Sequence, residues 1–215
     1  NVWIADWNTR DQAQLRNIRS TVGMVFQAPD SQIVASTVQE DVAFGPENLG
    51  VPEDELAQRV DWALVTVGLS ELQNHASHLL SAGQKQRLAI ASALAMRPRC
   101  LALDEATAML DPVGRRHLLQ TINQLHKDGI TIVTATHDMS EAAQARRIVV
   151  LSKGRVALDG TPRSVFRQEA ALRALEMDVP PAARLARAVT TLVPGFRADA
   201  LTVTEVVDSV SVCLA

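Results

Sequence analysis

The sequence predicts an α/β fold in which short buried strands alternate with helical segments. Three apolar runs rich in β-branched or aliphatic residues suit such strands, at residues 22–26, 100–103 and 130–135. Runs without polar alternation are typical of strands buried in a parallel sheet. Because ligands in open α/β sheets bind beyond the carboxyl ends of the strands, the polar residues that follow these runs are the first candidates for a functional site.

Composition places the chain among ordinary globular proteins, with one domain or one domain and a small appendage in its 215 residues. The net charge of −3 and the mixed charges give no indication of nucleic-acid binding. Two cysteines, Cys100 and Cys213, are too few for a disulfide framework and suit a reducing cytoplasm. No apolar run could span a bilayer and no signal peptide is evident, so we expect any membrane role to come through a partner protein.

A helix is predicted to begin at Ser81. Ser81 and Gln84 have the spacing of a capping box, and apolar or small residues recur at helical spacing over residues 88–96. The N-terminus of a helix carries partial positive charge, and the small Ala82 and Gly83 would let backbone N–H groups approach a phosphate. An ordinary capped helix explains the same residues, so this pattern alone leaves both interpretations open.

Two adjacent carboxylates, Asp104 and Glu105, follow the strand predicted at residues 100–103. Neighbouring residues on a strand point to opposite faces, so the two acids can take different tasks. One can hold a metal ion while the other activates a water molecule. A solvated strand end is the alternative explanation for an isolated Asp-Glu pair.

The order of these motifs resembles the ATP-binding-cassette (ABC) ATPases. Residues 80–84, Leu-Ser-Ala-Gly-Gln, are similar to the family's signature sequence, and residues 100–105 to its Walker B strand ending in Asp-Glu. Residues 108–112, Ala-Met-Leu-Asp-Pro, resemble the D-loop. Gln27 resembles the Q-loop glutamine and His137 the switch histidine. Taken alone, Gln27 would be an ordinary loop residue and His137 a structural one.

The resemblance implies the P-loop NTPase-like fold of an ABC ATPase that binds ATP and Mg²⁺. Asp104 and Gln27 would complete the Mg²⁺ shell. Glu105 would act as general base on the attacking water, and His137 would contact the γ-phosphate. The same resemblance implies that a second ABC ATPase subunit, identical or not, joins this one around two ATP molecules.

The signature and D-loop residues would contact nucleotide across that dimer. By resemblance, Ser81, Gly83 and Gln84 would face the ATP held by the partner, and Asp111 would belong to the same nucleotide-binding set. Asp111 before Pro112 also suits a helix N-cap, and both roles can hold. Ala82 stands where the family has glycine; we expect reduced tolerance rather than loss of function.

Residues 37–50 resemble the ATPases of energy-coupling-factor importers and of the related cobalt and nickel importers. This implies uptake of a vitamin or a transition-metal ion, integral membrane transporter subunits as partners, no nucleic acid, and a peripheral location at the cytoplasmic face of the cell membrane. The ordinary interpretation of these residues is an amphipathic helix stopped at Gly45-Pro46.

The domain organisation that follows has an ABC ATPase domain over residues 1–178 and a helical C-terminal extension over residues 179–215. A helical insert at about 37–80 is expected, with a helix over residues 53–67 that ends at Gly68. Further elements are expected downstream: a helix from Pro112 to Lys127, a hairpin at 148–158, a helix from Thr161-Pro162 to Phe166, and a capping box at Thr202 and Glu205.

No Gly-Lys pair occurs in the sequence, so it contains no G-x-x-x-x-G-K-[ST] phosphate-binding loop. We expect the chain to correspond to a cassette without its first strands and P-loop. The alternative is a non-catalytic partner that lends only its signature residues to another ATPase chain. A soluble ABC ATPase of DNA repair or translation is a third interpretation, but the long coiled-coil insertions or tandem cassettes usual there are absent from this sequence.

We expect the 215-residue chain to fold poorly alone, because a missing central strand would leave strand edges and apolar sheet surface open. Circular dichroism on heating should show a poorly cooperative transition. A reversible, cooperative melt at high temperature without any partner would contradict this expectation.

Overall fold

The computed structural model describes residues 2–193 and 195–214, and it divides into two compact units at the junction of Ala135 and Thr136. Each unit contains its own cluster or clusters of buried apolar side chains. The division lies elsewhere than the predicted boundary at 178/179, which remains a prediction. None of the helices in the described ranges has the length and apolar character needed to cross a bilayer.

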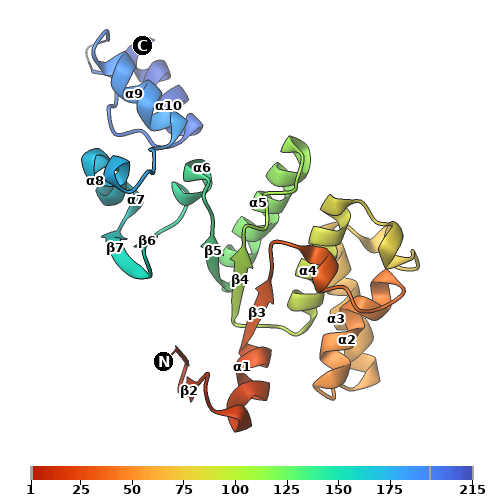
Figure 1. Cartoon of the computed structure of the whole chain (residues 1–215). Helices are drawn as coiled ribbons and strands as arrows, with labels where there is room; N and C mark the ends of the chain where they lie inside the picture. The colour runs from red at the N-terminus through yellow and green to blue at the C-terminus, as the bar shows by residue number, and fades with distance from the viewer. Residues whose placement is uncertain (1, 194, 215) are drawn as a thin grey trace. The chain divides into compact units, whose positions relative to one another are not determined.

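A three-stranded parallel sheet lies at the centre of the first unit (Figure 1). Its strands are β3 (Val22–Val25), β4 (Cys100–Asp104) and β5 (Thr131–Ala135), in the order β3-β4-β5. The register places Val25 opposite Leu103 and Asp104 opposite Ala135. This arrangement confirms the predicted α/β class, and each strand falls within one residue of its predicted bounds.

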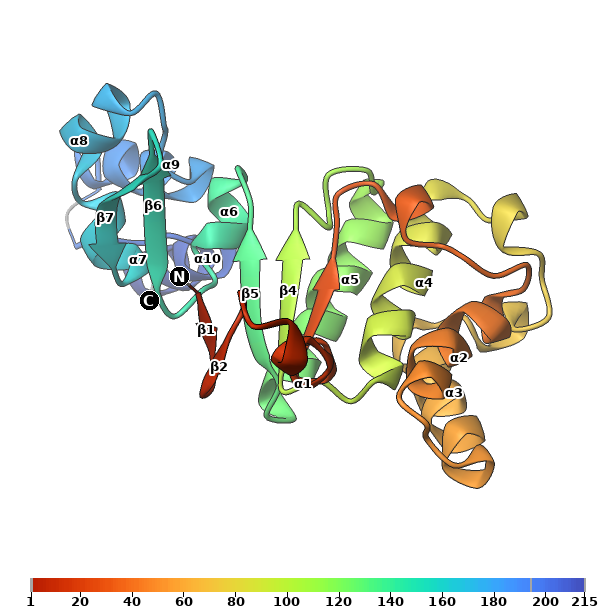
Figure 2. The ribbon, with the colours of Figure 1, turned by 60° about the horizontal axis from the view of Figure 1, so that its bottom comes forward.

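Helices α4 (Ala82–Ala95) and α5 (Pro112–Lys127) pack against one face of this sheet (Figure 2). Apolar side chains on the other face are exposed to solvent: Met24 is 50% exposed and Val133 is 56% exposed. The expectation that the third strand is buried is therefore wrong. Within the described residues β5 pairs only with β4, and Val133 faces away from the apolar cluster that α5 shares with the sheet.

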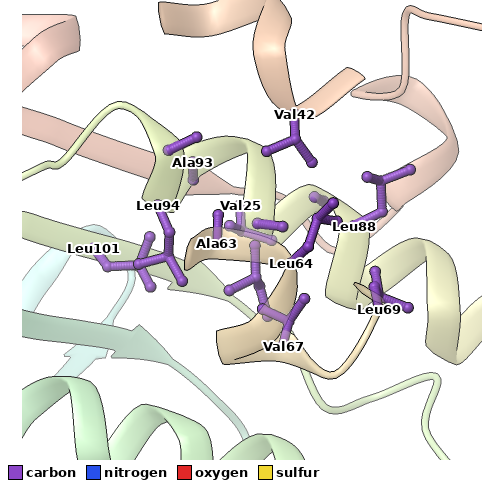
Figure 3. Close-up of a cluster of buried hydrophobic side chains, with 14 of the residues drawn as sticks. Val25, Val42, Ala63, Leu64, Val67, Leu69, Leu88, Ala93, Leu94 and Leu101 are labelled. Carbon is purple, nitrogen blue, oxygen red and sulfur yellow. The ribbon is translucent and has the colours of Figure 1, made fainter. Parts of the chain in front are cut away.

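The interval predicted as a helical insert is helical. It contains α2 (Val38–Asn48), α3 (Glu53–Val67) and two 3-10 turns, Ser70–Leu72 and Ser77–Leu79. Gly68 ends α3 in the left-handed conformation (φ 67°), as predicted. Val42 of α2, Leu64 of α3 and Leu94 of α4 meet in one buried cluster around Val25 (Figure 3).

Helix α2 does not stop at Gly45-Pro46 as predicted but continues to Asn48 with Pro46 inside it. Pro46 is buried, and a side-chain carbon at Gly45 would lie 2.9 Å from the Met96 side chain, so α2 and α4 approach closely here. The helix ends within one turn of the proline, so few backbone bonds are lost. Packing against α4 therefore outweighs the local signal to stop.

The amino-terminal residues of the first unit form small elements. Strands β1 (Trp3–Ile4) and β2 (Trp7–Asn8) pair as an antiparallel hairpin. A 3-10 turn, Gln12–Gln14, and helix α1 (Leu15–Thr21) then lead into β3.

The second unit contains the predicted hairpin, formed by β6 (Ile148–Ser152) and β7 (Arg155–Gly160). The turn residues Lys153 (φ 49°) and Gly154 (φ 73°) both have left-handed backbones, which suits a tight hairpin turn. The helices of this unit are α6 (Met139–Ala142), α7 (Pro162–Phe166), α8 (Glu169–Ala174), α9 (Pro181–Thr190) and α10 (Val203–Leu214).

The capping box predicted at Thr202 and Glu205 forms in part. The Thr202 hydroxyl accepts from the Glu205 N–H at 3.3 Å, while the Glu205 carboxylate accepts from the N–H of Leu201 at 2.6 Å and pairs with Arg163 at 2.5 Å. Partial burial favours a raised pKa for Glu205, but the Leu201 N–H and the nearby guanidinium groups lower that pKa overall. This carboxylate therefore ties the start of α10 to α7.

Replacing Leu64 by alanine should lower the free energy of unfolding by about 2–5 kcal/mol, because the side chain is 1% exposed and its removal leaves a cavity. Val65 is the next residue on α3 and is 68% exposed, so Val65→Ala is the matched control and should change stability by less than about 0.5 kcal/mol. Urea denaturation of the full-length protein measures both. Equal losses would contradict the placement of the core.

Candidate functional site

The side chains of Gln27 and Glu105 meet at the carboxyl edge of the sheet. The Gln27 Nε2 donates a hydrogen bond of 2.9 Å to the Glu105 Oε2 across 78 residues of sequence. Both residues leave neighbouring parallel strands, β3 and β4, whose ends lie at the same edge. The structure thus brings together two of the residues that the sequence singled out.

Glu105 has a left-handed backbone, with φ 45°. Its N–H still donates to the carbonyl oxygen of Ala135 at 2.9 Å, and its own carbonyl oxygen accepts from the Ala108 N–H at 3.0 Å. A non-glycine residue in this region typically costs about 1–3 kcal/mol, and such strain is common at functional sites. The strand ends at Asp104, so the alternation expected of adjacent strand residues does not direct the Glu105 side chain.

Asp104 is the exposed last residue of β4. Its carboxylate and the Gln27 side-chain oxygen are the kinds of donor that Mg²⁺ prefers, and Mg²⁺ usually takes one or two protein ligands beside waters and phosphates. Since Gln27 donates to Glu105 through nitrogen, its oxygen is left for a cation. In the described ranges no group of three or more His, Cys, Asp or Glu side chains could hold a metal ion.

The strand that carries these acids begins with a neutral side chain. Burial raises the pKa of the Cys100 thiol, which therefore stays protonated near neutral pH. Cys100 sits at the opposite end of β4 from Asp104. The negative charge of this strand is therefore confined to its carboxyl end.

The predicted capping box at the start of α4 is present. The Ser81 Oγ accepts from the Gln84 N–H at 3.3 Å, and the Gln84 Oε1 accepts from the Ser81 N–H at 2.8 Å. Within the part of the chain that the structure describes, the N–H groups of Ala82 and Gly83 have no acceptor. These two donors are therefore positioned to bind an anion. The hydrogen bonds of Gln84 stabilise the turn in which the donors lie.

Asp111 caps helix α5. Its Oδ1 accepts from the Gly114 N–H at 2.6 Å, with Pro112 in the first turn as predicted. A side-chain carbon at Gly83 would lie 3.4 Å from the Leu110 side chain. The signature turn and the residues before Asp111 are therefore close neighbours within one chain.

His137 is exposed and belongs to the second unit, two residues after the end of β5. The residues on each side of it are held locally. The Thr136 hydroxyl accepts from the Asp138 N–H at 3.0 Å and donates to the Glu141 carboxylate at 3.1 Å. Asp138 in turn caps α6 by accepting from the N–H groups of Ser140 and Glu141. Its neighbours thus fix the backbone from which the imidazole extends.

Sequence reasoning missed four polar residues around Gln27: Asp30, Gln32, Asp41 and Lys85. The Gln32 side chain bonds the backbone at the end of β3 as a neighbouring strand would. Its Oε1 accepts from the Phe26 N–H at 2.7 Å, and its Nε2 donates to the Met24 carbonyl oxygen at 2.9 Å. Only Asp41 carried a usable signal, since it lies among apolar positions on a predicted amphipathic helix. The contact of Lys85 with Asp30 joins segments 55 residues apart, and the contacts of Gln32 reach back six and eight residues in a pattern that no sequence motif marks.

Asp111→Ala should lower the free energy of unfolding by about 0.5–2 kcal/mol, because the Gly114 N–H loses its acceptor. Asp111→Asn is the matched control and should keep most of the stability, since asparagine caps helices about as well. Urea denaturation of the two variants of the full-length protein measures the difference. Equal destabilisation by both would show that the cap is not the source of the effect.

Comparisons with known proteins identify the family. Residues 2–108 match the ABC transporter family. The energy-coupling factor transporter ATP-binding protein EcfA1 of Caldanaerobacter subterraneus is 48% identical over 209 residues, which are 97% of this chain and 76% of that protein. The EcfA1 protein of Symbiobacterium thermophilum is 52% identical over 203 residues, 94% of this chain and 71% of that protein.

Solved structures lead to the same family. cbiO1 from Clostridium perfringens, described as part of the ABC transporter complex cbiONQ, is 38% identical with a TM-score of 0.70, covering 81% of this chain and 70% of that one. An ATP-binding cassette solved as a dimer in a post-hydrolysis state with ADP and Pi is 30% identical with a TM-score of 0.65, covering 74% and 72%. This chain therefore belongs to the ABC transporter ATPases, and among them to those of energy-coupling-factor type.

Proposed function

We propose that this chain supplies the hydrolytic residues for ATP-driven uptake of a vitamin or a transition-metal ion by an energy-coupling-factor importer. The observation that carries the proposal is the 2.9 Å hydrogen bond between Gln27 and Glu105 at the carboxyl edge of the sheet. This hydrogen bond holds the Gln27 amide, whose oxygen can bind a cation, beside the Glu105 carboxylate, which can accept a proton. Membership of the ABC transporter ATPases supports ATP as the substrate bound at this edge of the sheet.

Glu105 is the general base in this proposal, and it removes a proton from the water that attacks the γ-phosphoryl group. Such proton transfer usually contributes roughly 10²- to 10⁴-fold to the rate. The hydrogen bond from Gln27 orients the carboxylate. Asp104 and Gln27 would hold Mg²⁺, which when bound neutralises charge on the phosphate oxygens. His137 donates a hydrogen bond to the γ-phosphoryl oxygens, where negative charge needs stabilising.

The other nucleotide contact uses the start of α4. The Ser81 hydroxyl and the N–H groups of Ala82 and Gly83 bind the ATP of a second ATPase subunit, identical to this chain or not, with Gln84 and Asp111 completing the surface. The support is that these donors lie at a helix N-terminus, which favours anions. A related cassette was itself solved as a dimer with ADP and Pi bound.

The remaining partners follow from the relatives, since cbiO1 is part of a transporter complex. We propose that integral membrane subunits dock on the helical insert at residues 37–80 and hold the chain at the cytoplasmic face of the membrane. Residues 1–178 then form the ABC ATPase domain, and residues 179–215 form an extension of it.

Glu105→Gln tests the proposal in the full-length protein assembled with its membrane subunits. We expect ATP binding to persist and turnover to fall by about 10²- to 10⁴-fold, because glutamine keeps the size of the side chain but cannot take the proton. Glu176→Gln, at an exposed position outside the helical insert, is the control. Unchanged hydrolysis in Glu105→Gln would remove Glu105 from the role and favour a chain that only lends its signature residues.

A further inference from the structure

Asp41 is a buried acid at the junction of three segments. It lies on α2 and is 3% exposed. Its Oδ1 accepts from the N–H of Val34 at 2.7 Å and from the N–H of Ala35 at 3.1 Å. Its Oδ2 accepts from the Ser92 hydroxyl of α4 at 2.9 Å. A single carboxylate therefore joins α2, the residues after Gln27 and the helix that begins at Ser81.

The bond to Ser92 competes with a local one. The Ser92 Oγ also lies 3.1 Å from the Leu88 carbonyl oxygen of its own helix, and a hydroxyl has one hydrogen to donate. A charged acceptor forms the stronger hydrogen bond, so the carboxylate is the favoured partner. Without Asp41, Ser92 would be satisfied within α4, and the helix would lose this tie to the residues after Gln27.

A second contact joins the same two segments nearer the site. We define the Gln27 loop as residues 27–35. The Lys85 Nζ of α4 lies 2.5 Å from the Asp30 carboxylate of this loop. The Lys85 side chain is largely buried and the Asp30 side chain is exposed. Two contacts therefore tie this loop to α4. Near the start of the loop, Asp30 binds Lys85, which lies one turn past Ser81 on the helix. At the end of the loop, the tie runs through Asp41.

Burying a carboxylate is costly unless hydrogen bonds replace its hydration. Asp41 accepts from three donors, so that cost is offset only while loop and helix keep this geometry. An apolar residue would fill the same space without specifying where the loop lies. The buried carboxylate therefore fixes the position of the loop more than it adds to the free energy of unfolding.

We propose that Asp41 is a positioning residue that couples the Gln27 loop to α4, so that the placement of Gln27 beside Glu105 and the placement of Ser81 depend on each other. The inference rests on the function proposed above, in which Gln27 and Ser81 serve two different nucleotides. Binding of nucleotide at the Ser81 end then alters the loop, and a partner that displaces the loop alters the Ser81 end.

Hydrogen exchange at the amides of Val34 and Ala35 tests this coupling. It is measured in the complete transporter carrying Glu105→Gln, with and without ATP. With Asp41 and Ser92 intact, ATP should change exchange at both amides by roughly fivefold or more, the lower end of typical coupling factors. With Ser92→Ala added, the two amides should keep their protection without ATP, because Asp41 still accepts them, but should lose the response to ATP.

Two further variants separate coupling from damage to the fold. Asp41→Ala should speed exchange at Val34 and Ala35 by about 10- to 100-fold with or without ATP, because both amides lose a charged acceptor. Asp41→Asn should restore most of the response, since its oxygen can accept from the loop and its nitrogen can donate to Ser92. Ser20→Ala is the control, because among the described residues the Ser20 hydroxyl bonds only the Asn17 carbonyl oxygen of its own helix.

The outcomes distinguish this inference from the function on which it rests. If ATP alters exchange at residues 81–85 and the Val34 and Ala35 response survives in Ser92→Ala, the coupling role of Asp41 is wrong while the proposed function stands. If ATP alters exchange nowhere and the transporter with native Glu105 shows no hydrolysis, the proposed function itself is wrong. Loss of the response in Ser92→Ala with retained protection supports the coupling.

Discussion

Two parallel strands that pair in register bring their carboxyl ends to the same edge of a sheet, and β3 and β4 do so with Val25 opposite Leu103. The residues that leave them are Gln27 and Glu105, which therefore meet although 78 positions separate them. β5 extends the edge by placing Ala135 opposite Asp104, and it also accepts the Glu105 N–H. Every hydrolytic role assigned to the first unit rests on this strand pairing.

Helix α4 connects the apolar core with the candidate site. Most of its residues after Lys85 are buried among α2, α3 and the sheet, while its first turn is open and carries Ser81. A helix rises about 1.5 Å per residue, so Ser81 and Ser92 lie roughly 16 Å apart along it. A packed helix is stiff over such a length, which is why a polar contact at Ser92 can bear on events at Ser81.

Local signals in the sequence were enough for the strands and for most of the caps. The apolar runs, the capping box at Ser81, the N-cap at Asp111 and the glycine after α3 depend on neighbouring residues alone, and the structure confirms them. The errors arose where tertiary packing decides. Pro46 stays inside α2, where it is buried and where Gly45 lets the helix approach Met96 closely.

The candidate site was less accessible to sequence reasoning than the strands. The residue types at the strand ends indicated where it lies, but the left-handed backbone of Glu105 and the contacts of Asp30, Asp41 and Lys85 did not follow from any spacing. These features depend on segments that are distant in sequence and become neighbours only after the sheet and α4 have formed.

The reciprocal bonds between Ser81 and Gln84 join residues of a single turn, so they need no other group in order to form. The first turn of α4 thus already has the shape in which it would present the Ala82 and Gly83 N–H groups. Little conformational entropy remains to be lost when an anion arrives, so the main cost of contact is the removal of water from two amides. Association at this turn should therefore depend on the charge of the anion and on ionic strength more than on chain flexibility.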